Sequence, residues 1–143
     1  MIAIDTNILI DLLVSSMPTH LSTTENLKNL NDDICTTPTN IGESLRLLTH
    51  TRVFPKPLSI SAAVTALGEL LEFYQIRILE EDINWWQALP EIEKEIPALR
   101  GNEIFDARIA LCLRSNGVKQ IYTRDADFKK YKFLKQMLNF DRA

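Results

Sequence analysis

The chain has 143 residues, of which 45% are hydrophobic and 24% are charged, with only four glycines and six prolines. This length and composition are typical of one globular domain with a hydrophobic core, and they exclude collagen-like and disordered chains. The net charge of −3 is unlike that of the basic domains that bind nucleic acid in general.

The sequence indicates a cytoplasmic protein. No apolar run approaches the roughly 20 residues of a membrane-spanning helix, and the N-terminus lacks the features of a secretory signal. Cys35 and Cys112 fit this compartment, because neither belongs to a Cys-x-x-Cys pair and both have apolar neighbours. We expect them to be buried free thiols rather than a disulfide or a zinc site.

Short β-branched runs begin to alternate with helical patterns at the N-terminus. Residues 2–4 form an apolar run, and isoleucines and leucines then recur at helical spacing. This pattern predicts a strand, a turn and a helix with Asp5 or Thr6 near its N-cap. A second helix is predicted over residues 23–30, and a second strand over 34–37.

Two longer helices follow. Pro38 opens the first, and Ser59 caps the second, which is predicted to run to Tyr74. A third strand is predicted over residues 76–79. The residues expected on the buried faces of the two helices are Ile41, Leu45, Leu48, Val64, Leu67, Leu70 and Leu71.

The next helix is predicted over residues 82–95. Ile83, Trp86 and Leu89 are expected on one side of it. Trp85 and Trp86 are adjacent and must point in different directions, so one is expected in the core and the other partly exposed.

The last quarter of the chain repeats the alternation. A helix is predicted from Gly101 or Asn102 through Arg114, with Asn116-Gly117 at its C-cap. A fourth strand over 120–123, a short helical turn over 128–131 and a last strand over 137–140 follow. Strands that alternate with helices predict a parallel sheet. We therefore expect a single three-layer α/β/α domain over residues 1–143, with a central sheet of four to five strands.

Two acidic residues follow predicted strands. Asp5 comes directly after the first strand and Asp125 just after the fourth. In an open parallel sheet, ligands bind beyond the carboxyl ends of the strands, so both carboxylates are aimed at one edge.

Two more acids border apolar helix faces. Asp106 precedes apolar residues one and two turns along its helix, and Glu43 lies beside an apolar stripe. A carboxylate in this setting is costly unless a metal ion, or an arginine such as Arg46 or Arg108, pairs with it. The pattern leaves both partners open.

Taken together, the four acids indicate a metal site. Carboxylates clustered without histidine or cysteine suit Mg²⁺ or Mn²⁺, and two such ions hydrolyse phosphodiesters without a protein nucleophile. Asp127 is an alternative to Asp125 as the fourth ligand. Asp11 is interpreted as a solvated or capping group. Small polar residues expected to orient the carboxylates are Thr6, Asn7 and Thr123.

Basic residues crowd the end of the chain. Three basic residues lie close in sequence to Asp125 and Asp127, and they are Arg124, Lys129 and Lys130. This group is either an ordinary solvated face or a set of RNA phosphate contacts.

Four segments together resemble the PIN-domain family. They are Asp5-Thr6-Asn7, residues 39–43, residues 105–110 and residues 123–128. The length of the chain is similar to that of the VapC-type toxins within this family. The resemblance implies a Mg²⁺- or Mn²⁺-dependent endoribonuclease that acts on RNA and forms a homodimer inhibited by a small antitoxin protein. It also implies that the catalytic acids are Asp5, Glu43, Asp106 and Asp125.

The segment over residues 53–75 carries more apolar side chains than one buried face needs. It contains Phe54, Leu58, Leu71, Phe73 and Tyr74. Part of it is interpreted either as ordinary core or as a groove for a second copy or an antitoxin.

Two other functions are compatible with parts of the pattern. The first is an aspartyl phosphotransferase with Asp5 as nucleophile, although Asn7 stands where such enzymes carry a general acid. The second is a non-catalytic PIN-like module that binds RNA or serves as a scaffold.

Overall fold

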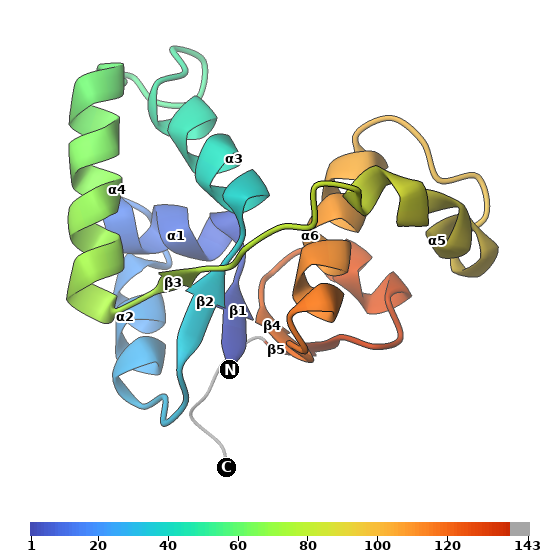
Figure 1. The fold of residues 1–143 in the computed structure, drawn as a ribbon. Helices are drawn as coiled ribbons and strands as arrows, with labels where there is room; N and C mark the ends of the chain where they lie inside the picture. Colours follow the sequence, from blue (N-terminus) through green and yellow to red (C-terminus); the bar gives the residue numbers. More distant parts are fainter. Residues whose placement is uncertain (138–143) are drawn as a thin grey trace.

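A computed structural model describes residues 1–137 and contains a five-stranded sheet in the order β3-β2-β1-β4-β5, with every pair of neighbours parallel (Figure 1). β1 lies at the centre, between β2 and β4. The strands are β1 (Ile2–Ile4), β2 (Ile34–Thr36), β3 (Arg77–Ile78), β4 (Gln120–Tyr122) and β5 (Lys135–Met137).

Helices connect the strands and cover both faces of the sheet (Figure 1). The α-helices are α1 (Thr6–Leu13), α2 (His20–Lys28), α3 (Pro38–Leu48), α4 (Ile60–Tyr74), α5 (Leu89–Glu95) and α6 (Glu103–Ser115). Two short 3₁₀ turns are η1 (Trp85–Ala88) and η2 (Ala126–Lys130). No helix in the described part of the chain is long and apolar enough to cross a membrane.

The central strand divides the core into two layers. Side chains alternate along a strand, so Ile2 and Ile4 face one side of the sheet and Ala3 faces the other. The first side packs against α1, α2 and α4, and the second against α5 and α6. The predicted three-layer α/β/α architecture and parallel sheet are therefore confirmed. Both cysteines are buried free thiols, also as predicted.

The caps of three helices determine what lies at the carboxyl edge of the sheet. Asp5 caps α1, Thr37 caps α3, and Ser59 caps α4 through side-chain hydrogen bonds to backbone N–H groups. Because the first two caps directly follow β1 and β2, the first turns of α1 and α3 meet at that edge. The predictions for Asp5, Pro38 and Ser59 are confirmed.

The predicted helix over residues 82–95 is wrong in its first half. The carboxylate of Asp82 accepts a hydrogen bond from the Asn84 N–H, and this local turn replaces the helix. The chain then forms the η1 turn, and α5 begins only at Leu89. Ile83 is consequently 85% exposed and Trp86 56% exposed, whereas Trp85 packs against the core.

Burial on two helices also differs from the prediction. On α4, Ala63 and Leu67 are buried and Val64 is 54% exposed. On α3 the polar Asn40 and Ser44 are buried, while Ile41 and Leu45 are only partly buried. Leu48 is buried as predicted. The buried face of α3 also includes two polar residues that were not expected there, and one of them, Asn40, reaches Asp5 at the carboxyl edge of the sheet.

The remaining differences are shifts of element ends. α2 begins at His20, three residues before the expected start, and β5 occupies Lys135–Met137. The rest of the strand predicted over 137–140 lies outside the described residues.

Candidate metal-binding active site

Five acidic side chains come together at the carboxyl edge of the sheet. Glu43 lies on α3 and Asp106 on α6, whereas Asp5, Asp125 and Asp127 follow strands β1 and β4. The charges of Asp5, Glu43, Asp125 and Asp127 all act on Asp106. All five acids selected from the sequence therefore belong to one electrostatic cluster.

Asp5 is the most buried of these acids, with 5% of its surface exposed. Its Oδ1 accepts hydrogen bonds from the Thr6 N–H at 2.8 Å and from Asn40 Nδ2 at 2.9 Å. Its Oδ2 accepts from Thr123 Oγ1 at 2.6 Å and from Asn7 Nδ2 at 3.4 Å. Burial raises the pKa of Asp5, and the bonds from Thr123 and Thr6 oppose that rise. Neutral donors therefore hold this carboxylate in a single orientation.

Thr6 links Asp5 to the second acid. Its hydroxyl donates to Glu43 Oε1 at 2.7 Å and accepts from Asn40 Nδ2 at 3.0 Å. Asn40 in turn accepts a hydrogen bond from Thr37 Oγ1 at 2.7 Å. One buried amide thus ties the first turn of α1 to the first turn of α3.

Asn40 was not selected from the sequence. It stands three residues after the Thr37 N-cap, the position from which Glu or Gln usually reaches back to the cap in a capping box. That spacing was the signal in the sequence that could have identified Asn40 as a residue that contacts the cap. Its 1% exposure, and its bonds to Asp5 and Thr6, became visible only in three dimensions.

Thr123 performs the equivalent link on the other side of β1. Besides donating to Asp5, its hydroxyl accepts hydrogen bonds from Asn7 Nδ2 at 3.1 Å and from the Asp125 N–H at 3.0 Å. Thr6, Asn7 and Thr123, the three small polar residues selected from the sequence, all contact acids or each other in this network.

Asp106, Asp125 and Asp127 form the tightest group, with one oxygen of each within 4.8 Å of the others. Burial, followed by repulsion from Asp125, raises the pKa of Asp106 to about 7. Asp125 also accepts a hydrogen bond from the Asp127 N–H at 2.9 Å. Both candidates for the fourth ligand therefore lie beside Asp106.

Little positive charge compensates this cluster. Among residues 1–137, only Asp127 of the five acids has an ion pair, with Lys130 at 3.6 Å. Arg108, one of the two arginines considered as a partner, instead binds both oxygens of Glu81 at 2.7 Å. A set of carboxylate oxygens without histidine or cysteine fits a hard divalent cation such as Mg²⁺ or Mn²⁺.

The basic residues selected from the sequence separate into two groups. Lys129 and Lys130 are exposed on η2, close to Asp127. Arg124 instead directs its guanidinium at Asp11, whose carboxylate is completely buried. The interpretation of Asp11 as a solvated or capping group is therefore wrong, because the residue lies between α1 and α2 and is neutralised there.

A groove of about 760 Å³ runs along the acid cluster between α3 and α6. Glu43 and Arg46 line it from α3, and Phe105 and Asp106 from α6. Arg46 is exposed and forms no ion pair within residues 1–137, and the Phe105 ring is 48% exposed. The groove therefore combines acids with a free cation and an accessible aromatic face.

Comparison with known proteins identifies a matching family and solved structures with the same fold. The family model described as "PIN domain" matches residues 2–134. A curated relative, "Ribonuclease VapC48" of Mycobacterium tuberculosis, is 26% identical over 87 residues, which are 61% of this chain and 59% of that protein. The aligned part of this chain thus spans less than two thirds of the relative's length.

Solved structures share the fold at low identity. VapC20 of Mycobacterium tuberculosis, described as a toxin that cleaves the sarcin–ricin loop, has a TM-score of 0.67 and 21% identity, with 90% of this chain and 93% of that chain covered. VapBC2 of Rickettsia felis, solved with a fragment of promoter DNA, has a TM-score of 0.65 and 17% identity, with 96% and 98% covered.

The raised pKa of Asp106 makes the stability of the metal-free chain depend on pH. The folded-state pKa of about 7 exceeds the usual 3.8, so the folded protein binds more protons in this interval, and the free energy of unfolding falls as pH rises through it. Asp106→Asn removes the repulsion. In EDTA at about pH 8 the variant should be more stable than the wild type by on the order of 1–2 kcal/mol, after allowance for solvent screening.

Urea unfolding followed by tryptophan fluorescence measures this difference. The gain should vanish below about pH 4, where residue 106 is uncharged in both the wild type and the variant. Glu69→Gln, on the exposed side of α4, is the matched control and should show no such pH dependence. A gain from Asp106→Asn that is the same at both pH values would contradict the prediction.

Proposed function

Because this chain belongs to the PIN-domain family, we propose that it is a metal-dependent endoribonuclease and the toxin of a toxin–antitoxin pair. The observation that carries the proposal is the carboxylate cluster at the carboxyl edge of the sheet, in which Asp127 alone has an ion pair within residues 1–137. The name of the curated relative, a ribonuclease, supports RNA as the substrate. We further propose a cytoplasmic protein that forms a homodimer.

Asp5, Glu43, Asp106 and Asp125, with Asp127 as the alternative to Asp125, would hold Mg²⁺ or Mn²⁺. When bound, such ions activate water and stabilise the charge that develops on a phosphodiester. The contribution of the chain itself is to bring its acids together and to orient them. Neutral donors do this for Asp5 and Glu43 without adding a positive charge that would compete with a cation.

The geometry argues against the phosphotransferase alternative. Asn7, at the position of the general acid, donates to Asp5 and to Thr123. The non-catalytic alternative is distinguished from an enzyme by measuring RNA cleavage.

We predict that Asp106→Asn abolishes cleavage while the protein stays folded. Asp106 makes no side-chain hydrogen bond within residues 1–137, so its replacement removes charge without leaving donors unpaired. Asp5→Asn is a poorer test, because an amide cannot accept the bonds that four donors now give to Asp5. Cleavage of a mixed RNA pool with Mn²⁺ should fall by at least about a hundredfold in Asp106→Asn, a loss of roughly 2.7 kcal/mol in transition-state stabilisation.

The same measurement separates enzyme from binding module. The wild type should lose activity in EDTA and regain it on addition of Mn²⁺, and Glu69→Gln should behave as the wild type. Cleavage by Asp106→Asn at the wild-type rate, or by the wild type in EDTA, would refute the metal-dependent mechanism. Absence of cleavage of every RNA tried, combined with RNA binding, would favour the non-catalytic module.

We also propose that a single RNA strand lies in the groove between α3 and α6. A cation and an exposed aromatic ring beside a cleavage site are the two groups that bind a nucleic-acid strand, through phosphate and base respectively. Arg46 and Phe105 supply them on opposite walls. Their exposure leaves both side chains accessible to substrate.

Two substitutions test this strand path in EDTA, where RNA binds without being cut. Arg46→Gln should weaken binding and lower its salt dependence by about one counterion, whereas Phe105→Leu should cost roughly 1–3 kcal/mol without changing that dependence. Fluorescence anisotropy with a labelled oligonucleotide measures both. Arg52→Gln and Phe73→Leu are exposed controls of the same types, and equal effects from control and test variants would place the RNA elsewhere.

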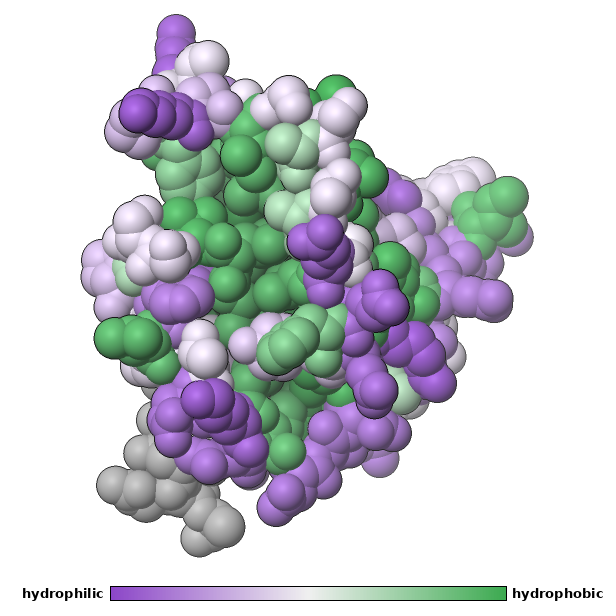
Figure 2. All heavy atoms as spheres, turned by 90° about the vertical axis from the view of Figure 1, so that its left-hand side faces the viewer, coloured by the Kyte–Doolittle hydropathy of each residue, from purple (hydrophilic) through white to green (hydrophobic). Residues whose placement is uncertain are grey.

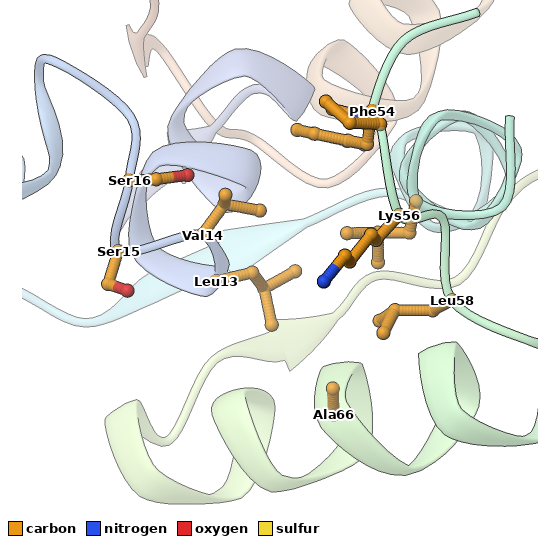
Figure 3. Close-up of a pocket in the computed structure, with 10 residues that line it drawn as sticks. Leu13, Val14, Ser15, Ser16, Phe54, Lys56, Leu58 and Ala66 are labelled. Carbon is orange, nitrogen blue, oxygen red and sulfur yellow. The ribbon is translucent and has the colours of Figure 1, made fainter. Parts of the chain in front are cut away.

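A second groove, on the other side of α3, is proposed to bind the antitoxin. Apolar side chains gather over this side of the molecule (Figure 2), around a cavity of about 480 Å³. Leu13 and Val14 from the end of α1, Phe54 and Leu58 from the α3–α4 connection, and Ala66 from α4 point into it (Figure 3). Of the apolar residues expected in the 53–75 segment, Leu71 and Tyr74 instead pack in the core.

The groove has one charged lining residue, Lys56, among apolar side chains. The occupant it fits is therefore an apolar helical segment that carries an acidic residue. Structures of the same fold include pairs of toxin and antitoxin chains, which supports an antitoxin as the source of that segment.

The partner to test is the protein encoded by the gene next to the one that encodes this chain. We predict that Leu58→Glu weakens its binding at least about tenfold, because a charge would lie unpaired on an apolar wall. Calorimetry with the purified partner measures this, and RNA cleavage should be unchanged. Ile83→Glu alters a more exposed apolar residue outside the groove and should bind normally. Normal binding by Leu58→Glu would exclude the groove.

A further inference from the structure

A buried ion pair lies beside the acid cluster and belongs to none of the roles assigned so far. Asp11, on α1, has no exposed surface. Its Oδ2 accepts a hydrogen bond from Thr23 Oγ1 of α2 at 2.9 Å. Arg124 contacts both carboxylate oxygens, with Nη2 at 3.0 Å from Oδ1 and Nη1 bonded to Oδ2.

This pairing commits Arg124 to the interior of the protein. A fully buried carboxylate is strongly unfavourable without a cation, and the planar fork of arginine matches its two oxygens. The Arg124 side chain is 38% exposed, so its outer edge reaches solvent while its charged end is engaged. An RNA phosphate would have to compete with Asp11 for the same guanidinium.

Arg124 lies in the turn that follows β4, between Thr123 and Asp125. Three interactions join this turn to the region of α1. Thr123 donates to Asp5 at the helix cap, the Arg124 N–H donates to Asn7 Oδ1 at 3.4 Å, and the Arg124 side chain reaches Asp11. The first is made by a side chain and the second by the backbone of the turn, and both reach the start of α1, whereas the third reaches one helical turn further along α1.

We propose that the Asp11–Arg124 ion pair positions Asp125 for metal binding, and that Arg124 is a positioning residue and not an RNA contact. The proposal rests on the proposed metal-dependent function. The pair holds the turn against α1, and Asp125, the next residue, is thereby kept beside Asp106. Without the pair, Thr123 and Asn7 would provide the remaining side-chain contacts between this turn and the region of α1 among residues 1–137, and Asp125 would face the other acids less often.

Mn²⁺ binding by the purified chain tests the proposal without relying on cleavage. Arg124→Gln should weaken Mn²⁺ affinity by at least about tenfold, the usual effect of removing a group that orients a ligand. RNA affinity in EDTA and its salt dependence should be unchanged. Arg124→Lys keeps the positive charge but loses the planar guanidinium, and its Mn²⁺ affinity should fall between those of the wild type and Arg124→Gln.

Because Arg124→Gln leaves the buried Asp11 without a cation, a second variant keeps the test decisive. Asp11→Asn combined with Arg124→Gln removes both charges and can replace the ion pair by neutral hydrogen bonds. This double variant should be folded by circular dichroism and yet bind Mn²⁺ about tenfold more weakly. Lys132→Gln, which removes an exposed charge from the same part of the chain, should bind Mn²⁺ as the wild type does.

Two results would overturn the proposal. One is wild-type Mn²⁺ affinity in the folded double variant. The other is an Arg124→Gln variant with normal Mn²⁺ affinity whose RNA binding has lost about one counterion of salt dependence, which would make Arg124 an RNA contact. Failure of the wild type to cleave RNA would count against the proposed ribonuclease and leave the Mn²⁺ comparison unaffected.

Discussion

Mutual repulsion among carboxylates at one edge of the sheet is the constraint on which the rest of the structure depends. Five acids lie together there, and burial, followed by repulsion from the other acids, raises the pKa of Asp106 to about 7. A protein that neutralised these acids with its own cations would gain stability and lose the site. This chain instead separates the two requirements, because neutral donors orient the acids, while Arg108 and Arg124 pair with Glu81 and Asp11, outside the cluster.

This separation explains why hydroxyl and amide side chains surround Asp5. Thr6, Asn40 and Thr123 each join two segments of the chain, and each does so through a bond to an acid or to another member of the group. The first turns of α1 and α3 and the turn after β4 are thus built around one carboxylate. Strand order brings these segments to the same edge, and the hydrogen bonds bring them to within reach of a shared ion.

Features set by local pattern were predictable from the sequence, whereas those set by contacts between distant segments were not. Side-chain alternation and capping residues predicted β1, the start of α3 and the cap of α4. The acids could be placed because each lies within a predicted helix or soon after a predicted strand. Asp11 and Arg124 lie 113 residues apart, so no local pattern pairs them. The helix predicted to begin at Asp82 was wrong for the opposite reason. A local turn forms there instead, because the helical pattern had no packing to support it.

The order of the strands also governs when the site can exist during synthesis. The central strand β1 is made first, but its neighbour β4 is made near the end, and the Thr123–Asp5 hydrogen bond spans 118 residues. Contacts of such long sequence separation form late, after the loop between them has closed. A nascent chain that ends before β4 therefore holds Asp5 and Glu43 without Asp125. For the proposed ribonuclease, this topology would delay activity until β4 has left the ribosome.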